Sequence, residues 1–154
     1  MRRDLIPIVA LLMMMMIAAS GCEDLPTDPT PSQRILGDWK SSKVGAAFTP
    51  AADVDIEFKV NGELTASIDG GARQAGSYTT LPSSTSVSIR TIDMSIGLAT
   101  YKGIYDINGT EMKLEVVSKS SPPTIEAPTD VEGIGSTRVN GVKTMDYVTV
   151  MQRQ

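Results

Sequence analysis

The chain has 154 residues, with 14 Lys and Arg, 18 Asp and Glu, no His and one Cys. Without His it lacks the usual nucleophile–base pairs and histidine metal ligands, and one Cys makes neither an intrachain disulfide nor a Cys-based zinc site. The formal charge of −4 argues against nucleic acid as a partner, and we expect a protein that is not an enzyme and has no cofactor.

The first 21 residues have the pattern of a secretory signal peptide. A basic start at Arg2 and Arg3 precedes an apolar stretch from Leu5 to Ala19, and small residues follow it. As a helix this stretch would span about 22 Å, which is short of the roughly 30 Å hydrocarbon core of a membrane. The alternatives are a buried core helix and a true membrane span.

The segment Ala19-Ser20-Gly21-Cys22 resembles the lipobox of bacterial lipoproteins, although Ala19 stands where Leu is usual. In that family the Cys thiol receives a diacylglyceryl group, cleavage makes the Cys the new N-terminus, and its amine is usually acylated. The resemblance implies that Cys22 holds the protein on a membrane, because two or more buried chains anchor stably. By the same resemblance, Glu23 favours the outer over the inner membrane. The alternative is an ordinary signal peptide with an incidental Cys.

Residues 22–33 are interpreted as the lipidated Cys and a Pro-rich tether. Pro26, Pro29 and Pro31 lie among polar residues without an apolar period. In polyproline geometry the 11 residues after Cys22 would hold the domain about 34 Å from the lipid. Alternatively, part of this segment packs on the domain. The chain from Cys22 onward has 12 basic and 17 acidic residues, a formal charge of −5.

Residues 34–154 have the patterns of one all-β domain. The stretch from Asp53 to Val60 alternates apolar and charged residues, which is typical of a half-buried strand. Asn61-Gly62 follows it and predicts a hairpin with a type I′ turn. The next strand should run through Leu64, Ala66 and Ile68, and a weaker strand is expected over 73–80.

Two further strands are expected over 85–94 and 99–107. In the first, the apolar phase slips between Ile89 and Ile92, which predicts a bulge or a sharp bend. The second places Tyr101, Gly103, Tyr105 and Ile107 on one face. Asn108-Gly109 then leads into a strand through Met112, Leu114 and Val116.

The end of the chain combines a long loop with a last hairpin. Three prolines within 118–135 exclude a central strand, so we expect a loop that is either a lid over a barrel mouth or a mobile insertion. Asn140-Gly141 should join a short segment near 137–139 to a strand over 142–151. About eight to nine strands with mostly short turns predict an antiparallel meander of about eight strands that closes as a barrel, with a β-sandwich as the alternative.

The segment Ile35-Leu36-Gly37-Asp38-Trp39 contains Gly-x-Trp at the start of the first strand. With the β-meander that follows, it resembles the lipocalin and wider calycin group, in particular the lipocalin-like domains of bacterial lipoproteins. Residues 105–114 also resemble a strand–turn–strand unit of that group. The resemblance implies that Gly37 and Trp39 close one barrel end and that a late basic residue, Arg153 or Arg138, packs across the Trp.

If the barrel closes, one apolar residue set should line its interior, and a barrel of this size is either filled or holds one small ligand. We expect non-catalytic binding of a small hydrophobic ligand by an anchored envelope lipoprotein. The alternative is an interaction module with a filled barrel and an unknown envelope protein as its partner. The expected lining residues are Val54, Ile56, Phe58, Leu64, Ala66, Ile68, Tyr101, Tyr105, Met112, Leu114 and Val116.

The segment Asp53-Val54-Asp55-Ile56-Glu57 superficially matches the Asp-x-Asp-x-Glu stretch of a chitinase-like glycosidase group. That machinery sits on a (β/α)₈ barrel of roughly 250 residues, which is longer than this chain. The three carboxylates share one strand face, which indicates a solvated surface, with a weak Ca²⁺ site as the alternative.

Overall fold

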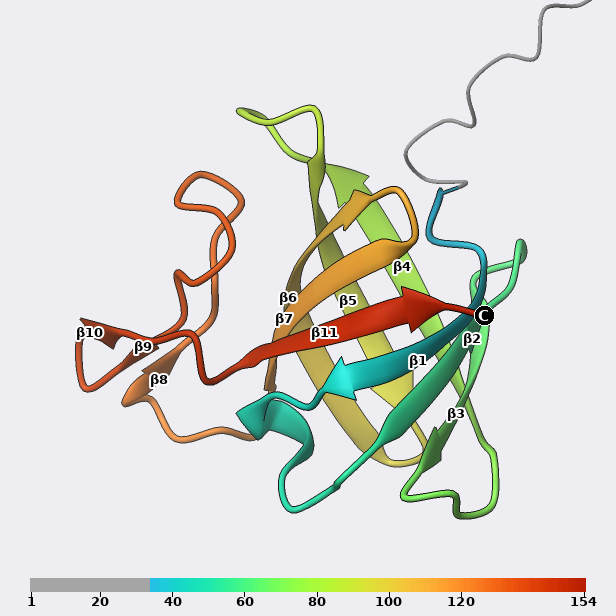
Figure 1. Ribbon diagram of the computed structural model, residues 1–154. Coiled ribbons are helices and arrows are strands. Elements are labelled where there is room, and N and C mark those ends of the chain that lie inside the picture. The colour runs from blue at the N-terminus through green and yellow to red at the C-terminus, as the bar shows by residue number, and fades with distance from the viewer. Residues whose placement is uncertain (1–33) are drawn as a thin grey trace, which may run out of the picture.

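The computed structural model describes residues 34–154, and residues 1–33, which include Cys22, lie outside the described part (Figure 1). The described chain forms eight barrel strands, one short 3₁₀ turn (η1) and three two-residue strands. The barrel strands are β1 (Gly37–Lys43), β2 (Val54–Phe58), β3 (Glu63–Ile68), β4 (Gln74–Pro82), β5 (Ile89–Ile96), β6 (Ala99–Asn108), β7 (Glu111–Ser118) and β11 (Val148–Arg153). The remaining elements are η1 (Ala46–Phe48), β8 (Ile125–Glu126), β9 (Arg138–Val139) and β10 (Val142–Lys143).

The predicted meander barrel is confirmed. The strands close in the order β1-β11-β7-β6-β5-β4-β3-β2, and every neighbouring pair is antiparallel. Closure pairs both edges of the meander, so the barrel has no free strand edge. We call the end where β1 begins the tryptophan end, and the opposite end, next to η1, the phenylalanine end.

Alternation in β2 shows why the sequence pattern identified the barrel. Val54, Ile56 and Phe58 point inward and are buried, whereas Asp55 and Glu57 point outward. Successive side chains of a strand face opposite sides, so a strict two-residue period allows one register for a barrel with an apolar interior.

The turn chemistry differs in part from the prediction. Asn140-Gly141 has positive φ at both residues, as a type I′ turn requires. At Asn61-Gly62 only the Gly has positive φ, and the Gly62 amide donates to the Lys59 carbonyl at 3.2 Å. The predicted type I′ turn is therefore wrong there. The turn spans residues 59–62, and Gly62 takes the left-handed conformation at its last position.

The strand predicted over 85–94 begins later, at Ile89. Val87 lies in the loop between β4 and β5, and Ile89 pairs with Asp106 on the outer side of the barrel. No bulge is needed to explain the apolar phase, because the apolar residues of the inward face begin at Ile92 and continue through Met94 and Ile96.

The connection between β7 and β11 is more ordered than the loop we expected. It contains a three-stranded sheet in the order β10-β9-β8, beside the barrel (Figure 1). The strand predicted over 142–151 is divided into β10 and β11, so that single strand is wrong. In the β10 part, Val142 is exposed; in the β11 part, Met151 is buried inside the barrel.

Candidate functional site

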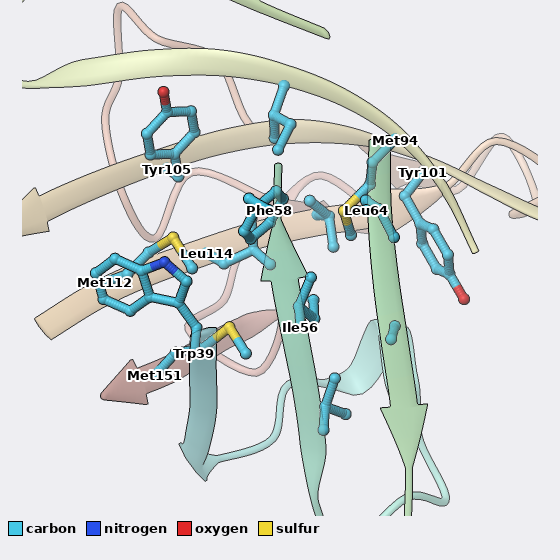
Figure 2. Close-up of a cluster of buried hydrophobic side chains, with 14 of the residues drawn as sticks. Trp39, Ile56, Phe58, Leu64, Met94, Tyr101, Tyr105, Met112, Leu114 and Met151 are labelled. Atoms are coloured by element: carbon cyan, nitrogen blue, oxygen red, sulfur yellow. The ribbon is translucent and has the colours of Figure 1, made fainter. Parts of the chain in front are cut away.

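The barrel interior is occupied by buried side chains from seven of its strands (Figure 2), and the partly buried Tyr78 of β4 packs against them. Of the eleven residues predicted to line it, ten are buried, with Tyr101 the most accessible at 7%. Ile68, at the end of β3, is half-buried. A ligand cavity would leave solvent-accessible surface on the side chains that line it, and these side chains have almost none. They form a packed core, in which the Phe58 and Tyr78 rings meet edge to face at 4.9 Å.

The tryptophan end is closed by groups from the start and the end of the described chain. The Trp39 indole N–H donates to the Ile35 carbonyl at 2.7 Å, and both residues are fully buried. The Arg153 guanidinium lies over the indole ring at 4.7 Å from its centroid and donates to the Arg34 carbonyl. The cation on Trp39 is thus Arg153; Arg138, the other candidate, pairs with Glu132 on the outside of the barrel.

The phenylalanine end is covered by η1, an element that our sequence analysis did not predict. Phe48 is buried and its ring centroid lies 5.3 Å from that of Tyr101. The turn is held by the Gly45 amide, which donates to the Thr149 hydroxyl at 3.0 Å. A side chain at Gly45 would meet the Tyr147 carbonyl oxygen at 2.6 Å, so only glycine fits. The cover over this barrel mouth is therefore η1. Residues 118–135, for which we considered a lid, belong to the connection that carries the small β10-β9-β8 sheet beside the barrel.

One polar pair interrupts the apolar interior near the tryptophan end. Arg90 and Tyr105 are direct cross-strand partners, and Arg90 shares the inward face with Ile92. Arg90 Nε and the Tyr105 hydroxyl are buried and have no hydrogen-bond partner within the described residues. Burial raises the pKa of Tyr105 above its ordinary value, while the nearby Thr80 hydroxyl and the Arg90 charge lower it in part.

A buried carboxylate attaches the β7–β11 connection to the outer face of the barrel. Glu115 points outward from β7 yet is fully buried. Its two oxygens accept the amide of Gly135 at 2.5 Å and the amide of Thr137 at 2.8 Å. The same outer face also holds Ile104 and Val117, which are buried although they point away from the interior. The connection is therefore a packed flank, and Glu115 supplies its central polar contact.

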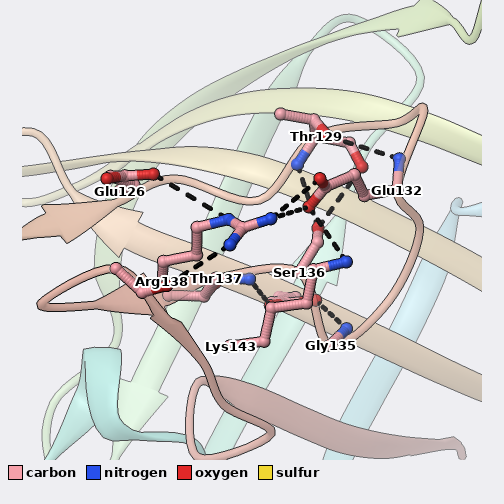
Figure 3. Close-up of polar contacts among 10 residues, drawn as sticks. Glu126, Thr129, Glu132, Gly135, Ser136, Thr137, Arg138 and Lys143 are labelled. Carbon is pink, nitrogen blue, oxygen red and sulfur yellow. Dashed lines mark hydrogen bonds and ion pairs between the residues drawn. The ribbon is translucent and has the colours of Figure 1, made fainter.

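Ion pairs stabilise the small sheet of this flank (Figure 3). Arg138 lies 3.0 Å from Glu132 and 4.0 Å from Glu126, and Lys143 lies 3.2 Å from Glu132. Hydrogen bonds from Lys143 and then Arg138 lower the pKa of Glu132. At the tip, Asp130 accepts the Ser84 amide at 3.1 Å, which joins the flank to the β4–β5 loop.

The Asp-x-Asp-x-Glu stretch lies on the outer face of the barrel and pairs with two cations. Lys40 Nζ lies 3.8 Å from Asp53 and 3.7 Å from Asp55, and Arg73 lies 2.9 Å from Glu57. Within residues 34–154, no group of three metal-ligating side chains converges. The half-exposed pairs each add little to stability.

A hollow of about 360 Å³ opens on this same outer face, beside β1 and β2. Its wall carries both signs of charge, positive from Lys40 and Arg73 and negative from Asp38 and Asp55. The described lining residues are Asp38, Trp39, Lys40, Asp55, Ile56, Arg73 and Gln154.

Comparison with protein-family models, with curated proteins and with solved structures finds no match to this chain. In residues 34–154 no helix is long and apolar enough to cross a membrane.

Proposed function

We propose that this protein is a lipid-anchored lipoprotein of the bacterial outer membrane, whose lipocalin-like barrel is a filled scaffold that binds another envelope protein. The observation that carries the choice of a scaffold over a carrier is the sealed interior. Ten of the eleven expected lining residues are buried, and both barrel ends are covered by Trp39 and Phe48. Recognition on a filled barrel takes place on its outer surface.

Two features support the anchored, lipocalin-like part of the proposal. The sole Cys of the chain, Cys22, ends a lipobox-like segment. At the barrel, Arg153 covers Trp39, which is the contact that a lipocalin-like closure implies. The anchor is tested by a Cys22→Ser variant, which should lose fatty-acid labelling and leave the membrane fraction. Unchanged fractionation of this variant would contradict the anchor.

The mixed-charge hollow beside β1 and β2 is the surface we assign to the partner, because complementary charges fix the orientation of a complex. A photo-crosslinking residue at position 40, on the hollow, should capture a discrete envelope protein in intact cells. The matched control is position 102, on the outer face of β6, where Lys102 is exposed. Equal crosslinking at both positions, or none at position 40, would contradict the assignment.

A second candidate function is the binding of a small hydrophobic molecule with a polar head. The specific observation in its favour is the buried pair of Arg90 Nε and the Tyr105 hydroxyl, since buried donors usually have acceptors. Native mass spectrometry of protein purified from its membrane separates the two functions. The scaffold predicts the mass of the acylated chain alone, whereas a carrier would retain a small molecule in a one-to-one ratio.

A further inference from the structure

Three loops or strand ends at the tryptophan end expose apolar side chains to solvent. Val60, in the turn between β2 and β3, is 86% exposed, and Leu81, at the end of β4, is 67% exposed. Val87, in the β4–β5 loop, is 93% exposed. Figure 1 shows the turn, the strand end and the loop at the end of the barrel where residue 34 begins. Side chains of this size gain free energy wherever an apolar phase is within reach.

The chain that precedes the barrel joins it at the same end. Arg34 lies beside the end of β11, where Arg153 donates to its carbonyl. Between Cys22 and Arg34 there are 11 residues, which reach about 34 Å in polyproline geometry. This inference rests on the proposed function, in which Cys22 is acylated. The tether then keeps the tryptophan end at high effective concentration near a lipid surface, so weak contacts are enough to dock it there.

The chemistry of the exposed segments fits a bilayer surface. Residues 81–88 carry no charge and contain five Ser and Thr, and the Asp130 carboxylate that contacts this loop already accepts the Ser84 amide. The turn that carries Val60 is flanked by Lys59 and Glu63, whose charges cancel. The apolar tips project from separate segments instead of forming a groove, which suits a broad deformable surface.

The β4–β5 loop is also fixed in place. Asp130 accepts the Ser84 amide, and the Thr85 hydroxyl donates to the Asp130 carbonyl at 3.5 Å. Hydrogen bonds from the Ser83 hydroxyl and then the Ser84 amide lower the pKa of Asp130, which keeps it an acceptor. The flank thus supports the loop in the position from which Val87 projects.

We propose that the tryptophan end of the barrel docks on the lipid surface through Val60, Leu81 and Val87, with the acylated Cys22 beside them. The phenylalanine end and its η1 turn then face away from the membrane. Leu98, in the turn between β5 and β6 at that far end, is 104% exposed and stays in water.

Single-cysteine labelling of the full chain tests this orientation. An acylated Cys22 does not react with thiol reagents, so a new Cys in V60C, V87C or L98C carries the only label. Each variant is expressed with its leader, labelled with an environment-sensitive NBD fluorophore and reconstituted into phosphatidylethanolamine–phosphatidylglycerol vesicles. L98C is the matched control, since it also replaces an exposed apolar side chain in a tight connection.

We expect blue-shifted emission at positions 60 and 87, with quenching by lipids that carry a nitroxide on the acyl chain, and aqueous emission at 98. Aqueous emission at all three positions in anchored protein, or a shift at 98 alone, would overturn the docking. Intact mass tests the anchor separately: a chain without acyl groups on Cys22 refutes the proposed function and the docking with it. An acylated chain with unshifted probes refutes the docking alone.

Discussion

An Ala66→Leu substitution in β3 would test whether the barrel is filled. Ala66 is 1% exposed and points inward. It pairs with Ile56 on β2 and lies two residues after the buried Leu64 on its own strand. In a core at native packing density, three added carbon atoms have no space, and overpacking costs about 1–3 kcal/mol. For a domain of this size that corresponds to a decrease in Tm of about 4–12 °C.

The assay is thermal and urea unfolding of A66L beside A75L, followed by the fluorescence of Trp39. Ala75 lies on β4 with its side chain exposed, so the same substitution adds the same atoms without crowding the interior. We expect A75L to unfold within about 0.5 kcal/mol of the parent protein. If A66L were as stable as A75L, the interior would have room for a ligand and the filled-barrel interpretation would be refuted.

Other contacts give further predictions. Glu115→Ala leaves two flank amides without their carboxylate and should lower the free energy of unfolding by about 2–4 kcal/mol in urea titrations; a loss below 0.5 kcal/mol would contradict the buried contact. Arg153→Ala should cost about 1 kcal/mol and shift Trp39 emission, whereas Arg138→Ala should leave that emission unchanged. Burial raises the pKa of Tyr105, so the folded protein favours the neutral phenol, and the stability that is present below about pH 10 falls as the pH rises further. Tyr105→Phe should reduce that fall in thermal melts at increasing pH, and an unchanged slope in the variant would refute the role of Tyr105.

The barrel was predictable because its signal is local. The period of two in Val54, Ile56 and Phe58 needs no partner to be recognised, and it specifies which face is inside. The choice between Arg153 and Arg138 could not be made from sequence. It depends on the β1–β11 register, in which Trp39 pairs with Arg153, and this register arises only when the barrel closes.

The features that sequence reasoning missed depend on contacts between distant residues. Glu115 looks like an ordinary outward charge on an alternating strand, and its partners are backbone amides about 20 residues later. Phe48 lies outside any alternating stretch, and its role as a cover depends on Tyr101 across the barrel mouth. Arg90 is a charged residue in an inward position, which a pattern of apolar residues cannot identify.

The most direct test of the filled barrel is xenon binding followed by NMR of the side-chain methyl groups in its interior. Dry apolar cavities bind xenon, whereas packed cores do not. The filled barrel predicts no saturable shifts for the methyl groups of Leu64, Leu114 and Val116 in the parent protein. It predicts clear shifts of Leu64 and Val116 in Leu114→Ala, where a cavity is made. Saturable shifts of these methyl groups in the parent protein would contradict the account and restore the barrel interior as a ligand site.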